Sequence, residues 1–383
     1  MKITLPDTAG KLADYTLTGV PIGQATLTPA SARVVFSAAH VVADPFTARD
    51  PYGPATVDWE GTMAFRRHLA GLGLGIAEAM DTAQRGMGLD WHGALELITR
   101  TRAEVPDALV FNGCGTDQLK PDDAATLDDV IAAYLEQLEA IQKVGGRIIL
   151  MASRALARVA TSPDDYLTVY AKVLEACDAP VVLHWLGPMF DPALAGYWGG
   201  NTFEACMETC LAMIKANTGK IDGIKISLLD KDKEITMRRR LPDGVKMYTG
   251  DDFSYPELIE GDDQGFSHAL LGIFDPLAPA AAYAVSKLSQ GDAASFRATL
   301  DPTVPLARQI FRAPTQHYKT GVVFLAWLNG FQDHFVMLNG AQAARPLPDL
   351  VTIFKQADAC GLLRDPDRAV ARMKRLLGLY GVA

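Results

Sequence analysis

The chain has 383 residues, of which 49% are hydrophobic and 21% are charged, a balance typical of a soluble globular protein. Its formal net charge of -9 argues against nucleic acid or an anionic membrane as the main partner. No apolar stretch is long enough for a signal peptide or a membrane span, and the five scattered cysteines are typical of reduced thiols. We therefore expect a cytoplasmic protein.

Residues 1–30 contain two segments with alternating apolar and polar residues, at 2–5 and 14–17, and a turn-rich stretch between them. This pattern predicts a β-hairpin that precedes the main fold. After residue 275, helical patterns broken by prolines continue to the end, near 277–290, 293–312, 317–337, 346–361 and 365–379. We interpret residues 291–383 as a C-terminal helical extension rather than a separate functional module.

Between these extensions, short apolar runs alternate with amphipathic helical segments. Eight runs are expected to form strands: 33–38, 74–80, 108–111, 147–151, 180–184, 221–227, 245–248 and 264–271. Helix starts are marked by Thr126 with Asp129 and by Ser162 followed by Pro163. The alternation predicts an α/β fold, a closed (β/α)8 TIM barrel over residues 31–290. An open doubly wound sheet is the alternative, but no G-x-G-x-x-G follows the first strand.

The sixth predicted strand carries a lysine, Lys225, in its apolar centre. Alternation along the strand sends Ile224 and Ile226 to one face and Lys225 to the other. In an apolar site the pKa of a lysine falls, and the neutral amine becomes a nucleophile suited to Schiff-base chemistry on a carbonyl substrate. The alternative is an edge-strand lysine whose ammonium reaches solvent.

In a TIM barrel the chemistry lies at the carboxyl ends of the strands and in the loops that follow them. At those positions the sequence places polar or ionisable residues in phase with the strand period. They are His40, Asp44, Asp81, Thr82, Gln84, Arg85, Asn112, Asp117, Ser153, Arg154, His184, Lys225, Gly250, Asp251, Asp252, Ser267 and His268.

Four stretches resemble the dihydrodipicolinate synthase / N-acetylneuraminate lyase family of class I aldolase barrels. Gly223-Ile-Lys225 resembles the G-[IV]-K around the family's Schiff-base lysine, and Ala179-Pro-Val-Val-Leu-His184 resembles its P-[VI]-[VI]-L-Y segment. Tyr248-Thr-Gly250-Asp251-Asp252 resembles its S-G-D-[DE] turn, and the run at 261–267 resembles its glycine-rich entry to strand eight. The likeness covers about residues 33–300, and a helical tail is also found in the family.

The resemblance implies a carbon–carbon lyase or aldolase that works through an imine at Lys225, needs no cofactor or metal, binds a small carbonyl substrate and forms a homo-oligomer. His184 stands where the family has a tyrosine that relays protons, so we expect His184 to move protons. The alternative is a histidine that only hydrogen-bonds a neighbouring loop. Gly250, Asp251, His268, Asn112 and Arg154 are expected to contact the substrate.

The loop that holds the substrate carboxylate in the family aligns with residues 80–84, where only Thr82 is kept in kind. An ionised Asp81 would repel a carboxylate about 4 Å away by about 4 kcal/mol at an effective dielectric near 20. Arg85 or Arg154 would compensate if either turned inward. Without that, Asp81, Gln84 and Asn112 suit hydroxyl or amide groups, so we expect a polyhydroxylated or neutral carbonyl substrate in preference to pyruvate.

Two other functions fit the sequence. A metal-dependent barrel enzyme would use His40, His184, His268, Asp251 and Glu78, although the chain has no paired His-x-His on strand one and no His-Glu-x-x-His. Cys206 and Cys210 resemble half of a metal site without a second half. A non-catalytic binding barrel is the third possibility, because a fold does not fix a function.

Overall fold

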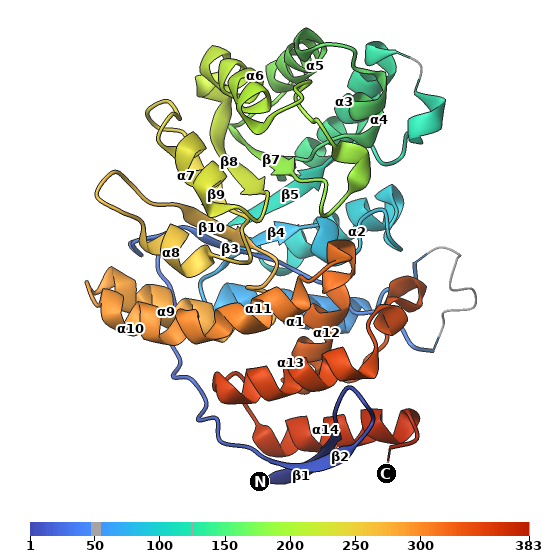
Figure 1. The fold of residues 1–383 in the computed structure, drawn as a ribbon. Coiled ribbons are helices and arrows are strands. Elements are labelled where there is room, and N and C mark those ends of the chain that lie inside the picture. Colours follow the sequence, from blue (N-terminus) through green and yellow to red (C-terminus); the bar gives the residue numbers. More distant parts are fainter. Residues whose placement is uncertain (47–54, 125, 383) are drawn as a thin grey trace.

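The predicted barrel is confirmed by a computed structural model, which describes residues 1–46, 55–124 and 126–382. Eight parallel strands close in the order β10-β3-β4-β5-β6-β7-β8-β9 (Figure 1). Their bounds are β3 (Val35–Ala38), β4 (Gly75–Glu78), β5 (Val110–Cys114), β6 (Arg147–Leu150), β7 (Val181–Leu186), β8 (Ile221–Ser227), β9 (Lys246–Thr249) and β10 (His268–Leu271). Every run predicted as a strand therefore contributes one strand to the barrel.

The strands are buried on both faces, as parallel strands covered by helices must be. Phe36, Phe111, Val182, Tyr248 and Leu270 belong to one apolar cluster that fills the barrel interior. The last predicted strand, 264–271, is shorter than expected and begins only at His268. Asp262 and Gly265 pair in a tight turn just before it, and Gly265 has a φ of +142°, which is incompatible with a regular strand.

Helices connect the strands on the outside of the barrel. They are α1 (Trp59–Gly71), α2 (Trp91–Glu104), α3 (Leu127–Lys143), α4 (Arg154–Val159), α5 (Pro163–Glu175), α6 (Phe203–Ala216), α7 (Lys231–Arg238), α8 (Tyr255–Glu260) and α9 (Ala278–Ser289). The predicted capping boxes are present at the starts of α3, with Thr126 and Asp129, and of α5, with Ser162 and Asp165. Short 3-10 turns lie at η1 (Asp81–Ala83), η2 (Pro121–Asp123), η3 (Pro192–Leu194), η4 (Thr218–Lys220), η5 (Asp301–Thr303), η6 (Thr315–His317) and η7 (Leu338–Ala344).

The N-terminal hairpin and the C-terminal helices pack together on one side of the barrel (Figure 1). The hairpin pairs β1 (Lys2–Pro6) with β2 (Leu12–Thr16), and the helices are α10 (Ala293–Leu300), α11 (Val304–Ile310), α12 (Tyr318–Leu328), α13 (Leu347–Ala359) and α14 (Pro366–Leu379). The Tyr15 hydroxyl donates a hydrogen bond of 2.8 Å to Asp358 on α13, which fixes the hairpin. Within the described residues, no helix is long and apolar enough to cross a membrane.

Candidate active site

A small cavity lies where the barrel strands end. Its lining includes the last residues of β3, β7 and β8 and the residues that follow β4, β9 and β10, together with side chains from the C-terminal helical part. The lining residues are Ala38, Met80, Asp81, Thr82, Leu186, Phe190, Lys225, Ser227, Asp252, Gly272, Phe311 and Tyr318. We call this space the inner cavity. It lies at the end of the barrel where TIM-barrel chemistry takes place.

Lys225 extends from β8 into this cavity and is only 7% exposed. Burial lowers the pKa of its ammonium below the ordinary value, while the nearby carboxyl groups of Asp252 and Asp81 oppose that shift. The strand therefore holds Lys225 inward, as predicted, and its surroundings favour the neutral amine that attack on a carbonyl requires.

Asp252 is the carboxylic acid that accompanies Lys225 in the inner cavity. One of its oxygens accepts a hydrogen bond of 2.9 Å from the Ile273 backbone N–H. Burial raises the pKa of Asp252 to about 7, against the opposing effect of that hydrogen bond and of Lys225. Burial favours the neutral form of both Lys225 and Asp252, and the charge of each opposes that effect on the other, so the protonation of the two groups is linked.

Asp251, which we expected to bind substrate, has a different role in the same turn. Its Oδ1 accepts hydrogen bonds from the backbone N–H groups of Phe253, at 2.7 Å, and Ser254, at 3.0 Å. It does not line the inner cavity. The structure thus brings Asp252 to Lys225 and uses Asp251 to shape the turn before α8.

Gly250 is the turn residue that allows this close arrangement. A Cβ at position 250 would lie 2.3 Å from Ser227 Oγ, 2.6 Å from the Ile226 carbonyl oxygen and 2.8 Å from Cε of Lys225. No side chain fits in that space. The predicted site residue Gly250 therefore acts by leaving room for the lysine.

His184 is the register partner of Lys225 on the adjacent strand β7. Its Nε2 lies 3.2 Å from Ser227 Oγ. Burial, and to a lesser degree the charge of Lys225, lowers the pKa of His184 well below its ordinary value. The structure therefore places a neutral imidazole beside the lysine, in hydrogen-bond reach of a serine hydroxyl that faces the inner cavity.

A hydroxyl pair forms another wall of the inner cavity. Thr82 Oγ1 and Tyr318 Oη are 2.8 Å apart, and both side chains are buried. Tyr318 comes from α12, and its ring stacks on Phe311 with centroids 4.4 Å apart. Burial raises the pKa of the Tyr318 phenol well above its ordinary value, so the phenol is neutral and can donate through its O–H or accept through its oxygen.

A second cavity, of about 180 Å³, lies next to the inner one and shares Asp81 and Leu186 with it. We call it the outer cavity. Its lining also includes His184, Arg154, Asp191, Thr116 and Met151. Asp81 and Leu186 therefore stand between the inner cavity at Lys225, which has a volume of about 10 Å³, and the outer cavity.

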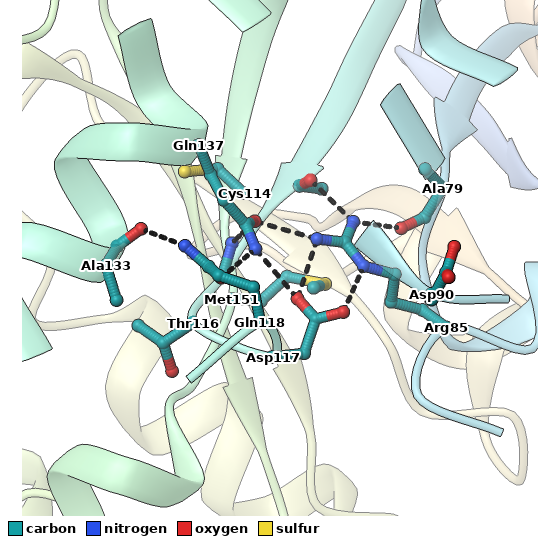
Figure 2. Close-up of polar contacts among 12 residues, drawn as sticks. Ala79, Arg85, Asp90, Cys114, Thr116, Asp117, Gln118, Ala133, Gln137 and Met151 are labelled. Atoms are coloured by element: carbon teal, nitrogen blue, oxygen red, sulfur yellow. Dashed lines mark hydrogen bonds and ion pairs between the residues drawn. The ribbon is translucent and has the colours of Figure 1, made fainter. Parts of the chain in front are cut away.

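Arg85 does not turn toward Asp81. Its guanidinium instead donates to the Asp117 carboxylate, from Nε at 2.8 Å and from Nη2 at 2.7 Å (Figure 2). Nη2 also donates to the Gln137 side-chain oxygen at 2.7 Å. Figure 2 shows this network joining the loop after β4 to the loop after β5 and to α3. Arg154 likewise forms an ion pair with Asp191 rather than with Asp81.

The cation that approaches Asp81 besides Lys225 is Lys319, the residue after Tyr318. It is 5% exposed, and its ammonium contacts the Gln316 carbonyl oxygen at 3.2 Å and Met87 sulfur at 3.6 Å. Burial lowers the pKa of Lys319 to about 8, Asp81 and Asp191 raise it, and Arg154 lowers it further. Asp81 is therefore within electrostatic range of two buried lysines.

Three predicted substrate contacts lie away from Lys225. The Gln84 side chain binds the backbone of Leu338, accepting from its N–H at 3.2 Å and donating to its carbonyl at 2.9 Å. Asn112 alternates with the inward Phe111 and donates to the Arg147 carbonyl at 2.9 Å on the outer face of the barrel. His268 is the first residue of β10, at the opposite end of the barrel, where its Nδ1 accepts from the Val34 N–H at 3.0 Å.

Residues 3–382 match the family described as "Protein of unknown function (DUF993)". The chain belongs to this family. A search of curated proteins gives no match to the DUF993 chain.

Solved structures of the dihydrodipicolinate synthase family are similar to the present chain. YagE, a prophage protein of the dihydrodipicolinic acid synthase family from E. coli, solved in complex with pyruvate, is 16% identical with a TM-score of 0.64. The match covers 92% of the present chain and 99% of YagE. Dihydrodipicolinate synthase from Aquifex aeolicus is 12% identical with a TM-score of 0.61, over 91% and 98%. The 4-hydroxy-tetrahydrodipicolinate synthase from Methylacidiphilum fumariolicum is 15% identical with a TM-score of 0.63, over 90% and 99%. The predicted resemblance is thus confirmed at the level of the fold.

The residues considered for a metal site do not gather in the DUF993 barrel. His40 Nδ1 pairs with Asp275 at 2.8 Å, and Glu78 pairs with Arg66 at 2.7 Å, both out of contact with solvent. Across residues 1–46, 55–124 and 126–382, no group of three or more His, Cys, Asp or Glu side chains is placed to hold a metal ion.

Three residues in or near the site were absent from the predicted set, Ser227, Tyr318 and Lys319, and Asp252 was named among the strand-end residues without a predicted role. Ser227 and Asp252 lie within the stretches that pointed to the site, and continuing the strand alternation two residues past Lys225 indicates Ser227. No local signal marks Tyr318 and Lys319, because only the packing of α12 against the barrel brings them to Lys225.

Proposed function

We propose that the protein is a Schiff-base-forming carbon–carbon lyase or aldolase that acts on a small carbonyl substrate through Lys225. The observation that carries this proposal is the buried Lys225 amine beside the Asp252 carboxyl group at the carboxyl end of the barrel. Lys225 forms no ion pair with the described residues and is suited to attack a carbonyl group, whereas a purely structural lysine would be expected to pair with an acid or reach solvent.

In the proposed reaction, the neutral Nζ of Lys225 attacks the carbonyl carbon and forms a carbinolamine. The former carbonyl oxygen then leaves as water, taking protons from the amine and from an acid, and the imine remains. Asp252 is suited to supply that proton, because burial raises its pKa to about 7.

Carbon–carbon cleavage requires a base that removes a proton from the substrate hydroxyl while the bonding electron pair moves into an enamine at Lys225. His184 and the Thr82–Tyr318 hydroxyl pair are the groups available for this transfer. Protonation of the enamine and addition of water to the resulting imine release the second product and restore Lys225.

Borohydride trapping tests the proposal. The protein is incubated with a panel of keto acids and aldehydes, reduced, digested and analysed by mass spectrometry. We expect a reduced adduct on the peptide that contains Lys225, and none in a Lys225→Arg variant. Lys246→Arg is the matched control, because Lys246 lies away from the cavity and forms an ion pair of 2.8 Å with Asp222. Labelling confined to another lysine, such as Lys319, would overturn the role of Lys225. No labelling by any compound would overturn the whole proposal and favour a non-catalytic barrel.

A further inference from the structure

The two neighbouring cavities differ in chemical character, and this difference bears on the substrate. The polar groups of the inner cavity are the carboxyl groups of Asp81 and Asp252, the hydroxyls of Thr82, Ser227 and Tyr318, and the amine of Lys225. Among its lining residues Lys225 is the one cation, and its nitrogen becomes bonded to the substrate carbon when the imine forms. Lys319 contributes charge through space, but its ammonium contacts Gln316 and Met87 and the side chain lines neither cavity.

A carboxylate next to the reacting carbonyl would therefore face two acidic side chains without a cation that binds it directly. Such a carboxylate needs hydrogen-bond donors or a cation to replace its hydration, and the hydroxyls of Thr82, Tyr318 and Ser227 already pair with each other or with His184. Substrate hydroxyl groups have the opposite requirement, since each can donate to a carboxyl oxygen of Asp81 or to the carbonyl oxygen of the Asp252 acid. The inner cavity is thus matched to hydroxyl groups on the carbons near the imine.

The outer cavity offers a cation with free donors. Arg154, at the start of α4, uses Nε for its ion pair with Asp191. Its Nη1 and Nη2 have no hydrogen-bond partner within the part of the chain that the structure describes, and the side chain lines the cavity. A guanidinium edge holds two oxygens of a carboxylate or phosphate at once. Lys319, close enough to Arg154 to be affected by its charge, adds positive potential there.

We propose that the substrate is a hydroxylated aldehyde or ketone with an anionic group at its far end. Its carbonyl group lies at Lys225, its hydroxyls at Asp81 and Asp252, and its carboxylate or phosphate at Arg154. This assignment rests on the proposed function, and it excludes simple 2-keto acids such as pyruvate as the preferred substrate.

Four probes test the assignment by borohydride trapping at Lys225: glyceraldehyde 3-phosphate, glucuronate, glyceraldehyde and pyruvate. The first two carry a distal phosphate or carboxylate, the third is hydroxylated but neutral, and the fourth carries a carboxylate next to its carbonyl. We expect at least one of the first two to label Lys225 at the lowest concentration, and pyruvate at the highest. The better of the two identifies the anion.

The Arg154→Gln variant separates binding of the anion from the chemistry. We expect it to raise the half-saturating concentration of the anionic probe by about tenfold or more and to leave that of glyceraldehyde unchanged. Arg158→Gln is the matched control, because Arg158 lies one turn further along the same helix and pairs with Asp122 on the surface.

The outcomes distinguish the two proposals. Tight labelling of Lys225 by pyruvate, or an equal effect of Arg154→Gln on the anionic probe and on glyceraldehyde, would overturn the substrate class and leave the Schiff-base function standing. Failure of all four probes and of the wider carbonyl panel to label Lys225 would overturn both.

Discussion

Gly250 lies directly against Lys225, so that a Cβ on the glycine would approach Cε of the lysine to 2.8 Å. A Gly250→Ala substitution should therefore displace Lys225 as well as strain the backbone of Ile226. We expect a loss of about 1–3 kcal/mol in unfolding free energy and a fall in Lys225 labelling well beyond what that loss explains. Chemical denaturation and trapping measure the two effects. Gly219→Ala is the control, because a Cβ there meets no atom within 4 Å. Normal labelling of Gly250→Ala would refute the spatial role of Gly250.

Asp252 should determine how imine formation depends on pH. With a pKa raised to about 7, the acid form is present below neutral pH and is lost as the pH rises through that value. An Asp252→Asn variant should form the imine about a hundredfold more slowly at pH 6. It should also lack the decline in rate above pH 7, while Asp252→Glu should partly restore both. A variant with an unchanged rate and pH profile would show that Asp252 supplies no proton.

His184 is predicted to move protons near Lys225. A His184→Phe variant should fold, since the site is buried and apolar in part, but should lose most of its turnover. A His184→Tyr variant should retain partial activity, because a phenol can also relay a proton. Steady-state kinetics on the substrate found by trapping, together with circular dichroism, measure these effects. Near-full turnover of a folded His184→Phe protein would leave His184 as a hydrogen-bond partner of Ser227 and nothing more.

The hydroxyl of Tyr318 can be removed while its stacking on Phe311 is kept. We expect Tyr318→Phe to lower kcat by about tenfold to a hundredfold with little change in melting temperature, because the ring remains and only the 2.8 Å contact to Thr82 is lost. If Tyr318 only supports packing, kcat will not change. Tyr380→Phe, at the exposed end of the chain, serves as the control.

Glu234 on α7 gives a prediction about stability and pH. Its Oε1 accepts a hydrogen bond of 2.7 Å from Ser267, and burial raises its pKa from 4.5 to about 8. The buried neutral acid therefore stabilises the fold fully below pH 4.5, and this contribution is lost as the pH rises toward 8. The loss is at most roughly 5 kcal/mol. Relative to wild type, Glu234→Gln should thus become progressively more stable between pH 5 and pH 8, unlike Glu139→Gln on the exposed face of α3. Parallel stability curves for Glu234→Gln and wild type would contradict this.

The sequence alone determined the barrel and the direction of Lys225. Strand alternation has a period of two, and helices need caps, so local patterns were enough to place eight strands, the capping boxes at Thr126 and Ser162, and an inward lysine. The sequence also pointed to Gly250. It did not show why a glycine is needed there, which is the nearby Lys225 side chain. The strands begin and end a few residues from the predicted positions. The reason is that hydrogen bonding between strands, and not local propensity, decides where a ladder stops.

The tertiary structure decided which polar residues share a cavity. Arg85 and Arg154 were both candidates to balance Asp81, but each lies closer to another acid, Asp117 or Asp191, and ion pairing depends on distance in space. Asn112 and His268 follow the strand rhythm, yet one faces the helices and the other lies at the amino end of its strand. Tyr318 and Lys319 are more than 90 residues from Lys225 in the chain, and the packing of α12 on the barrel brings them to the site. The sequence did not predict this, because no local pattern encodes a contact between such distant segments.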